Sequence, residues 1–242
     1  MGYRESAPAT HLRDLVETAW VVDGSGEQVH VLPDGCMDLI RMHGRIVVAG
    51  PDTASSVSTR GPEPIVGLRF HPGVLPRLLG VPASELRNAR VPLTELVSFP
   101  SGHGLDDVVR RLLLAPARRE TTPWPLATTH HVTASLARGA TVAAVARELG
   151  WSTRTLQRQC RAVYGYGPAT LRRILRFRRA ASMLSSGRTM ADVAAYTGYA
   201  DQPHLHREIR EFAGVSASAL ADRYVSGANK STDVPSGSVT VA

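Results

Sequence analysis

The sequence predicts an α+β chain with two domains. The N-terminal domain is expected to be a small β-barrel or sandwich with helices. The C-terminal domain is expected to be all-α, with about seven helices and two helix–turn–helix units. Two observations lead to this prediction. Short β-prone runs, separated by turn residues at intervals of about ten positions, fill the first part of the chain. A helical pattern in the second half occurs twice, at an offset of 48 to 49 residues.

The β-prone runs lie between residues 11 and 70. They are Trp20–Val22, Gln28–Leu32, Cys36–Met42, Arg45–Ala49, Ser55–Thr59 and Ile65–Phe70. Turn-forming clusters such as Pro33-Asp34-Gly35 separate them, because proline fixes φ and glycine accepts a positive φ. Short strands at this spacing are typical of a small sandwich or barrel.

After Gly73 the pattern becomes helical. Short apolar segments at 74–79, 84–86 and 93–97 precede a longer one at 104–115, whose apolar residues recur at helical spacing. Residues 116–125 contain three prolines and predict a linker. We therefore expect an N-terminal domain over 1–115, this linker, and a C-terminal domain over 126–225. The Ser- and Gly-rich tail, 226–242, is predicted to be disordered.

The repeat begins at Thr141 in its first copy and at Thr189 in its second. The residue pairs that correspond at an offset of 48 are Val145 and Val193, Ala146 and Ala194, and Gly150 and Gly198. Those that correspond at 49 are Leu156 and Leu205, Arg158 and Arg207, Arg161 and Arg210, and Gly165 and Gly214. One residue has therefore been inserted in a turn of a duplicated supersecondary unit.

Each copy predicts a helix–turn–helix. Thr141 and Thr189 suit the N-cap of a first helix, because a threonine side chain accepts a hydrogen bond from a free amide there. Gly150 and Gly198 suit its C-terminal end, where glycine adopts the left-handed conformation readily. The second helix is expected to bury Leu156, Cys160 and Val163 in one copy and Leu205, Ile209 and Phe212 in the other.

The outer face of each second helix is cationic, and this geometry suits insertion into the major groove of DNA. The predicted DNA-binding residues are Thr153, Arg154, Gln157, Arg158 and Arg161 in the first copy and Gln202, His206, Arg207 and Arg210 in the second. Arg154 and Gln157 lie near the helix N-terminus and are expected to read base edges, whereas Arg158 and Arg161 suit phosphate. The alternative is a solvated helix face.

The segment 168–186 joins the two units. Its 19 residues span about 28 Å as a helix. The two outer helices can then lie roughly one turn of DNA apart, ~34 Å, so that one monomer enters two successive major grooves.

Residues 126–224 resemble the DNA-binding domain of AraC/XylS-type transcription regulators. The tandem units and the central stretch Pro168-Ala169-Thr170-Leu171-Arg172-Arg173 carry the resemblance. The family commonly has aromatic residues at the positions of Leu205 and Ile209 and a proline at that of Ala217. The resemblance implies a homeodomain-like fold and a regulator, activator or repressor, whose partner is double-stranded DNA.

The front half is similar to an N-terminal domain found in a subset of the same family. The resemblance rests on residues 32–40, on Gly50-Pro51, and on residues 67–73. It implies a cupin-like barrel that binds a small-molecule effector, followed by a helix, here 104–115, that forms a homodimer contact. Cys36, Arg69 and His71 are the candidate residues of the effector pocket. Alternatively, Cys36 is a small buried side chain and His71 belongs to a strand-to-helix turn.

Charge and composition agree with a DNA-binding chain. The net charge is +7 over 242 residues, and residues 126–225 hold a net +8 against −1 for the first 125. Membrane-binding and RNA-binding proteins can also carry a basic half. Two cysteines are too few for a disulfide framework and predict a reducing compartment. With no long apolar run and no leader pattern, we expect a cytoplasmic protein without a membrane partner.

No catalytic or cofactor motif occurs in the sequence. It has no Gly-rich phosphate loop and no His-Glu-x-x-His pattern, so we expect no enzymatic activity and no cofactor. His30 and His71 lack the close-spaced partner that a Cys/His metal site with Cys36 would need, so no metal is expected. Two alternatives to an effector-gated regulator remain. One is an alkylation or redox sensor that acts through Cys36, and the other is a nucleoid-associated protein without sequence preference.

Overall fold

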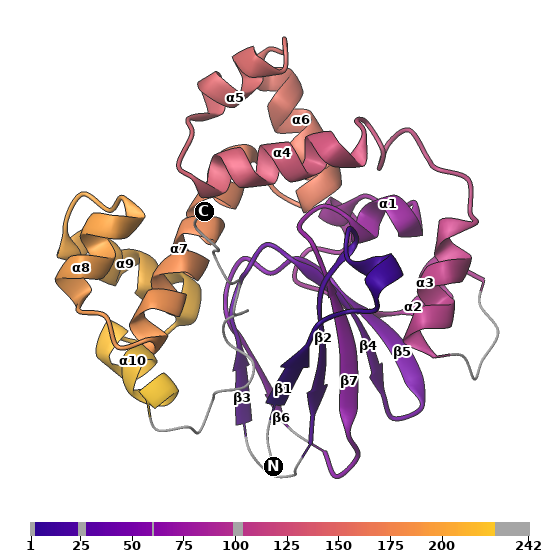
Figure 1. Ribbon diagram of the computed structural model, residues 1–242, viewed down its shortest axis with the longest axis horizontal. Helices are drawn as coiled ribbons and strands as arrows, with labels where there is room; N and C mark the ends of the chain where they lie inside the picture. Colours follow the sequence, from indigo (N-terminus) through magenta and orange to yellow (C-terminus); the bar gives the residue numbers. More distant parts are fainter. Residues whose placement is uncertain (1–2, 24–27, 60, 99–103, 226–242) are drawn as a thin grey trace.

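The structure is a computed structural model that describes residues 3–23, 28–59, 61–98 and 104–225. The predicted tail, 226–242, lies outside the described residues. Antiparallel strands and short helices form the first half of the chain, and helices form the second half (Figure 1). Among the described residues, no helix combines the length and the apolar character needed to cross a membrane.

The larger sheet has six antiparallel strands in the order β1-β2-β7-β4-β5-β8. They are β1 (Tyr3–Ser6), β2 (Val16–Val22), β4 (Met37–Met42), β5 (Arg45–Ala49), β7 (Ile65–Phe70) and β8 (Arg90–Pro92). A second sheet pairs β3 (Gln28–Val31) with β6 (Ser56–Thr59). Since no pairing among the described strands joins β1 to β8, the arrangement is the predicted sandwich and not a closed barrel.

Two strands, β1 and β8, were not predicted from the sequence. They form the two edges of the larger sheet, where each pairs on one side only. β8 contains Pro92, which is tolerated at a sheet edge because it has no N–H to donate to a second neighbour. β1 alternates half-buried and exposed side chains and includes Arg4 and Glu5, so its composition gives little β signal.

Short helices cover one end of the larger sheet (Figure 1). They are the 3₁₀ turns Thr10–Leu12 and Ala83–Glu85 and the helices α1 (Leu75–Leu79), α2 (Leu93–Leu96) and α3 (Leu105–Leu113). α3 was predicted over 104–115. Its apolar face buries Val108, Val109 and Leu112 in the core of its own domain, together with Leu39 and Phe70 of the sheet.

Seven helices follow within the described residues of the second half, as predicted. They are α4 (Leu126–Ala137), α5 (Val142–Glu148), α6 (Thr153–Tyr164), α7 (Pro168–Ser185), α8 (Met190–Thr197), α9 (Gln202–Ala213) and α10 (Ala217–Val225). The 18 residues of α7 span about 27 Å between the two helix–turn–helix units, α5–α6 and α8–α9 (Figure 1).

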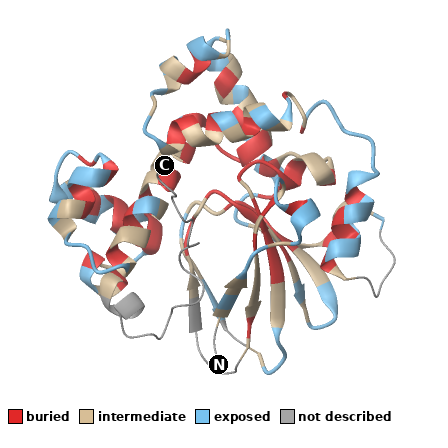
Figure 2. Ribbon diagram, viewed as in Figure 1, coloured by how far each residue is buried: buried red, intermediate tan, exposed pale blue. Residues whose placement is uncertain are grey.

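The predicted inner faces of α6 and α9 are buried. Leu156, Cys160, Val163, Leu205, Ile209 and Phe212 are each at most 2% exposed. They pack with the buried residues of α7 into one core, which Figure 2 shows as buried patches along the central helix. Trp124, from the predicted linker, also belongs to this core. Its ring stacks on Trp151 at 5.2 Å, and its Nε1 donates a hydrogen bond to Thr129 Oγ1 at 2.6 Å.

The helix ends follow the predicted capping with one difference. Thr141 and Thr189 accept hydrogen bonds from the backbone N–H groups of Ala144 and Asp192, so both are N-caps. Gly198 is the left-handed C-cap of α8, as predicted, with φ of 77°. In the first copy Leu149 occupies the C-cap position in a right-handed conformation, and the left-handed Gly150 follows it. The inserted residue lies in the second turn: two residues separate Gly150 from α6, whereas three separate Gly198 from α9.

Candidate functional site

The outer face of α6 is open to solvent. Thr153, Arg154, Arg158 and Arg161 are exposed. Ser152 accepts a hydrogen bond from the backbone N–H of Thr155 at 3.1 Å and so fixes the start of this helix. Gln157 is placed differently from its neighbours. Its side chain is half-buried and lies against the backbone of Gly167. A Cβ added to Gly167 would lie 2.3 Å from the Nε2 atom of Gln157.

The outer face of α9 has the same character. Gln202, His206, Arg207 and Arg210 are exposed, and Asp201 caps the helix by accepting from the N–H of His204 at 2.7 Å. His204 itself is half-buried in the first turn of α9, and the edge of its ring packs against Tyr199. Within the described residues, no ion pair or hydrogen bond is recorded for the guanidinium groups of Arg154, Arg158, Arg161, Arg207 or Arg210. These cations are therefore available to an external anion.

Three arginines of α7, Arg173, Arg176 and Arg178, instead form ion pairs within the protein. Arg173 and Arg176 both contact the carboxylate of Glu208, which is 2% exposed, at 3.1 and 2.8 Å. Tyr199 Oη also donates to Glu208 Oε1, at 2.8 Å. Burial by itself would raise the pKa of Glu208, but these hydrogen bonds together hold it below its usual value. This network joins α7 to α9 and sets the position of the second unit.

The N-terminal domain contains a cavity of about 640 Å³ between its two sheets. Its walls are mainly apolar: Val22, Val31, Leu32, Ile40, Met42, Val47, Ala49 and Ile65. Its charged and aromatic lining residues are Tyr3, Trp20, Asp34, Asp38, Asp52, Arg69 and Arg90. A largely apolar cavity with a few polar groups is the usual form of a small-molecule site.

Two of the three predicted pocket residues, Cys36 and Arg69, line this cavity. His71 does not. It lies at the turn before α1, where its Nε2 is 3.1 Å from the backbone oxygen of Arg13 and its ring meets the edge of His130 at 5.4 Å. Within the described residues, no group of three metal-ligating side chains is arranged to hold a metal ion.

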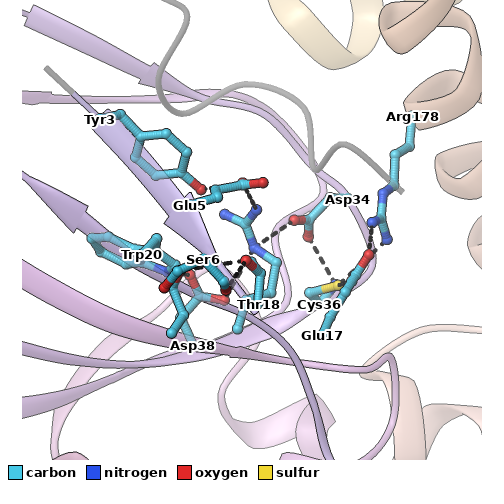
Figure 3. Close-up of polar contacts among 12 residues, drawn as sticks. Tyr3, Glu5, Ser6, Glu17, Thr18, Trp20, Asp34, Cys36, Asp38 and Arg178 are labelled. Carbon is cyan, nitrogen blue, oxygen red and sulfur yellow. Dashed lines mark hydrogen bonds and ion pairs between the residues drawn. The ribbon is translucent and has the colours of Figure 1, made fainter. Parts of the chain in front are cut away.

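Arg69 lies among carboxylates at one wall of the cavity. Its side chain is 7% exposed, and its guanidinium is 3.2 Å from Asp34, 3.5 Å from Asp38 and 3.6 Å from Glu5. Figure 3 shows Glu5 beside Tyr3, Asp38 beside Trp20, and Asp34 closer to Cys36. Burial raises the pKa of Asp38 to about 6; the charge of Arg69 opposes this rise and that of Asp34 adds to it.

The acids of this wall and their aromatic neighbours were missed in the sequence. Asp34 looked like a turn residue, and Asp38 interrupts the apolar run from Met37 to Ile40 at a single position. The one local signal was that interruption, because a lone carboxylate in a buried strand requires a partner. The partner, Arg69, lies 31 positions away in sequence, across the β4–β7 pairing.

Two cavity-lining loops also contact the helical half. In the loop 50–55, the backbone N–H of Ser55 donates to Phe212 O at 2.8 Å, and Ser55 Oγ donates to Ala213 O at 2.9 Å. In the loop 32–36, Gly35 packs against Leu171 and Leu175 of α7. The loops that line the cavity are thus the same loops that contact α7 and the C-terminal end of α9.

An ion pair crosses the same boundary. Arg178 of α7 donates to Glu17 of β2, and Cys36 Sγ lies 3.3 Å from the other oxygen of that carboxylate (Figure 3). Burial alone would raise the pKa of Glu17, but Arg178 brings it below its usual value. Cys36 is 5% exposed, and its burial, together with Asp34 and Glu17, raises the thiol pKa well above its usual value. A neutral, enclosed thiol is a poor nucleophile, which disfavours the alternative of a Cys36 sensor.

Gly165, at the end of α6, permits close contact between the two halves. Its φ is +83°, and a Cβ there would lie 2.6 Å from Pro51 and 3.1 Å from the Ala83 oxygen. We expect Gly165→Ala to lower the free energy of unfolding more than Gly150→Ala does. The second glycine has a similar φ but nothing within 4 Å, so its replacement costs only the left-handed penalty of roughly 1–2 kcal/mol. Equal losses in urea titrations of the two variants would contradict this close packing.

Comparisons with known proteins agree with the helical half of this description. A family described as a helix-turn-helix domain matches residues 130–223, and a family described as a domain of unknown function matches residues 4–92. No curated protein sequence matches the chain.

Among solved structures, ToxT from Vibrio cholerae is similar at 10% identity, over 91% of this chain and 98% of that one, with a TM-score of 0.42. ToxT from Vibrio cholerae O395 bound to (E)-4-(8-methylnaphthalen-1-yl)but-3-enoic acid is similar at 9% identity, over 93% and 100%, with a TM-score of 0.44.

The match over residues 130–223 covers α5–α6 and α8–α9 together with the helix α7 that joins them. It therefore coincides with the tandem units and the free arginines described above. The C-terminal region of the chain therefore carries an AraC-type helix–turn–helix domain, and it follows an N-terminal region that matches a domain of unknown function.

Proposed function

We propose that the outer faces of α6 and α9 bind two successive major grooves of DNA in a sequence-specific manner, and that a small molecule in the N-terminal cavity regulates this binding. The free arginines on both outer faces are the observation that supports DNA contact most directly. An exposed arginine that has no acidic partner among the described residues can contact a phosphate or a guanine edge.

The effector part of the proposal rests on the shared loops. A molecule that fills the cavity displaces or orders the loops 32–36 and 50–55, and these loops contact α7 and the C-terminal end of α9. Occupancy of the cavity is thereby coupled to the relative positions of the two units. Regulation requires a ligand to interact differently with two such arrangements, and coupling energies of this kind are typically about 1–3 kcal/mol.

A homodimer through α3 remains a prediction. The apolar face of α3 packs inside its own domain, so a dimer contact would have to use its outer side and end, where Leu113 and Leu114 are 47% and 86% exposed.

Replacing Arg154 with alanine tests the DNA-binding role. We expect operator affinity to fall by about 1–3 kcal/mol, with the loss concentrated at one base position, because the proposal assigns Arg154 to a base edge. Selection of bound DNA from a random pool, carried out with wild type and variant, measures both the affinity and the base preference at each position. Arg45→Ala removes an exposed arginine from β5 and serves as the control. Unchanged affinity and base preference in Arg154→Ala would contradict the placement of α6 in a groove.

Filling the cavity tests the effector role. Ile40 lines the cavity from β4, and Arg41, the next residue, is exposed on the opposite face of that strand. We expect Ile40→Trp to change operator affinity about fivefold or more, in either direction, while Arg41→Trp leaves it unchanged. If neither variant changes DNA binding although both remain folded, the cavity does not regulate it.

A further inference from the structure

The charges that line the N-terminal cavity are not balanced. Arg90 is fully engaged by Asp52, through hydrogen bonds of 3.0 and 2.6 Å from its two terminal nitrogens. Arg69 then faces Asp34 and Asp38, which line the cavity, and also Glu5, which does not; the described lining residues include no arginine besides Arg69 and Arg90. This wall of the cavity therefore carries excess negative charge in a largely apolar space.

Arg69 pairs with these carboxylates by charge and not through hydrogen bonds from its Nε or Nη1 atoms. Its Nε and Nη1 atoms are buried and lie at ion-pair distances of 3.2–3.6 Å, but neither makes a hydrogen bond of good geometry. The oxygens of Asp34 and Asp38 consequently keep lone pairs that a donor in the cavity can use. An anionic ligand would meet two arginines that are already paired and would be repelled by Asp34 and Asp38.

Aromatic side chains lie beside two of these acids, Tyr3 beside Glu5 and Trp20 beside Asp38. Tyr3 and Trp20 both line the cavity and stack on each other with ring centroids 6.0 Å apart. Trp20 Nε1 donates to Asp38 at 3.0 Å, which places the indole ring next to the carboxylate (Figure 3). An ammonium group is attracted both by carboxylates and by the faces of aromatic rings.

We propose that the cavity binds a small molecule with an apolar body and a cationic, ammonium-type head group. The apolar walls take the body, and the carboxylates of Asp34 and Asp38, with the rings of Tyr3 and Trp20, take the head. The inference rests on the proposed function only in naming the cavity as the effector site, and it adds the chemical class of the effector.

Three matched probes test the head group directly. Octylamine, octanol and octanoate share one chain and differ in a cationic, a neutral and an anionic head. Calorimetric titration of the full-length protein at pH 7.5 is expected to show octylamine binding about tenfold or more tightly than octanol, and octanoate most weakly. Octanoate or octanol binding as tightly as octylamine would overturn the proposal, and so would the absence of binding by all three.

The response to pH provides an independent reading. The ammonium of octylamine stays charged between pH 5.5 and 7.5, since its pKa is close to that of lysine, ~10.4. Asp38, which faces Arg69, Asp34, Arg90 and Trp20, takes up a proton near pH 6. Octylamine binding is therefore expected to weaken as the pH falls through this range, whereas octanol binding stays constant. Stronger octylamine binding in acid would contradict the role of this carboxylate.

Variants separate this inference from the proposed function. Asp38→Asn should remove most of the preference for octylamine over octanol, whereas Asp106→Asn, at an exposed position of α3, should keep it. Thermal unfolding of each variant checks that it is folded, and the wild-type comparison of probes does not depend on either variant.

If Ile40→Trp alters DNA binding but octanoate is the preferred probe, the ligand class is wrong and the regulatory cavity stands. If Ile40→Trp has no effect while octylamine binds selectively, the regulatory role is wrong and the ligand class stands.

Discussion

Replacement of Arg69 with methionine is expected to lower the free energy of unfolding by about 3–5 kcal/mol, as for other buried ion pairs that lose one partner. Methionine fills a similar volume, but it leaves Glu5, Asp34 and Asp38 facing one another without a cation. Their side chains are 13–17% exposed, so water relieves little of the repulsion. Urea unfolding followed by circular dichroism measures the loss.

The effect of Arg69→Met should depend on pH in a defined direction. Arg69 opposes the rise in the pKa of Asp38, so its removal raises that pKa further above the unfolded value. At pH values between the unfolded and the folded pKa of Asp38, the native state binds more protons than the unfolded state. The free energy of unfolding therefore falls as the pH rises. The loss should thus be larger at pH 7.5 than at pH 5. Arg45→Met, at an exposed site, is the control, and a small, pH-independent loss in Arg69→Met would contradict the buried cluster.

Replacement of Glu208 with glutamine is expected to have an effect of similar size, about 3–5 kcal/mol. Glu208 is 2% exposed and holds Arg173, Arg176 and Tyr199. Glutamine keeps the shape but removes the charge, so two arginines lose their shared partner. Glu211→Gln is a matched control on the same helix. Glu211 is 55% exposed and contacts Arg173 alone, so its loss should be roughly 0–1 kcal/mol.

The pH dependence of Glu208 has the opposite sign to that of Asp38. Its folded pKa lies below the usual 4.5, so its contribution is present above that value and is lost as the pH falls through the folded pKa. The difference in stability between wild type and Glu208→Gln should therefore shrink in acid. A difference that stays constant from pH 7 to pH 3 would show that the network adds no charge-dependent stability.

The helical half was predictable because its signals are local. The N-cap threonines, the glycines and the apolar spacing of α6 and α9 lie within a few residues of the structures they specify. The duplication strengthened the prediction, because the same capping and apolar residues recur at matching positions in both copies. Six of the strands were also predicted, with limits within one residue of the structure except for β2, whose predicted core Trp20–Val22 is the end of a longer strand. The edge strands β1 and β8 carry weaker signals and were missed.

The charged clusters were not predictable because their partners are distant in sequence. Glu208 meets Arg173 across 35 positions, and Glu17 meets Arg178 across 161. Nothing in the local sequence of α7 distinguishes Arg176, which is held by Glu208, from an arginine that faces solvent. For the same reason Arg69 was a candidate from its motif alone, and the acids around it became evident only in the folded arrangement.

The central claim is that one chain reads two successive major grooves through α6 and α9. Methylation-interference footprinting of the full-length protein on a selected DNA site tests it most directly. Two clusters of major-groove contacts per bound chain are expected, about 10 base pairs apart. Arg154→Ala should weaken one cluster and Arg207→Ala the other. A single cluster per chain, or both substitutions weakening the same cluster, would contradict the claim.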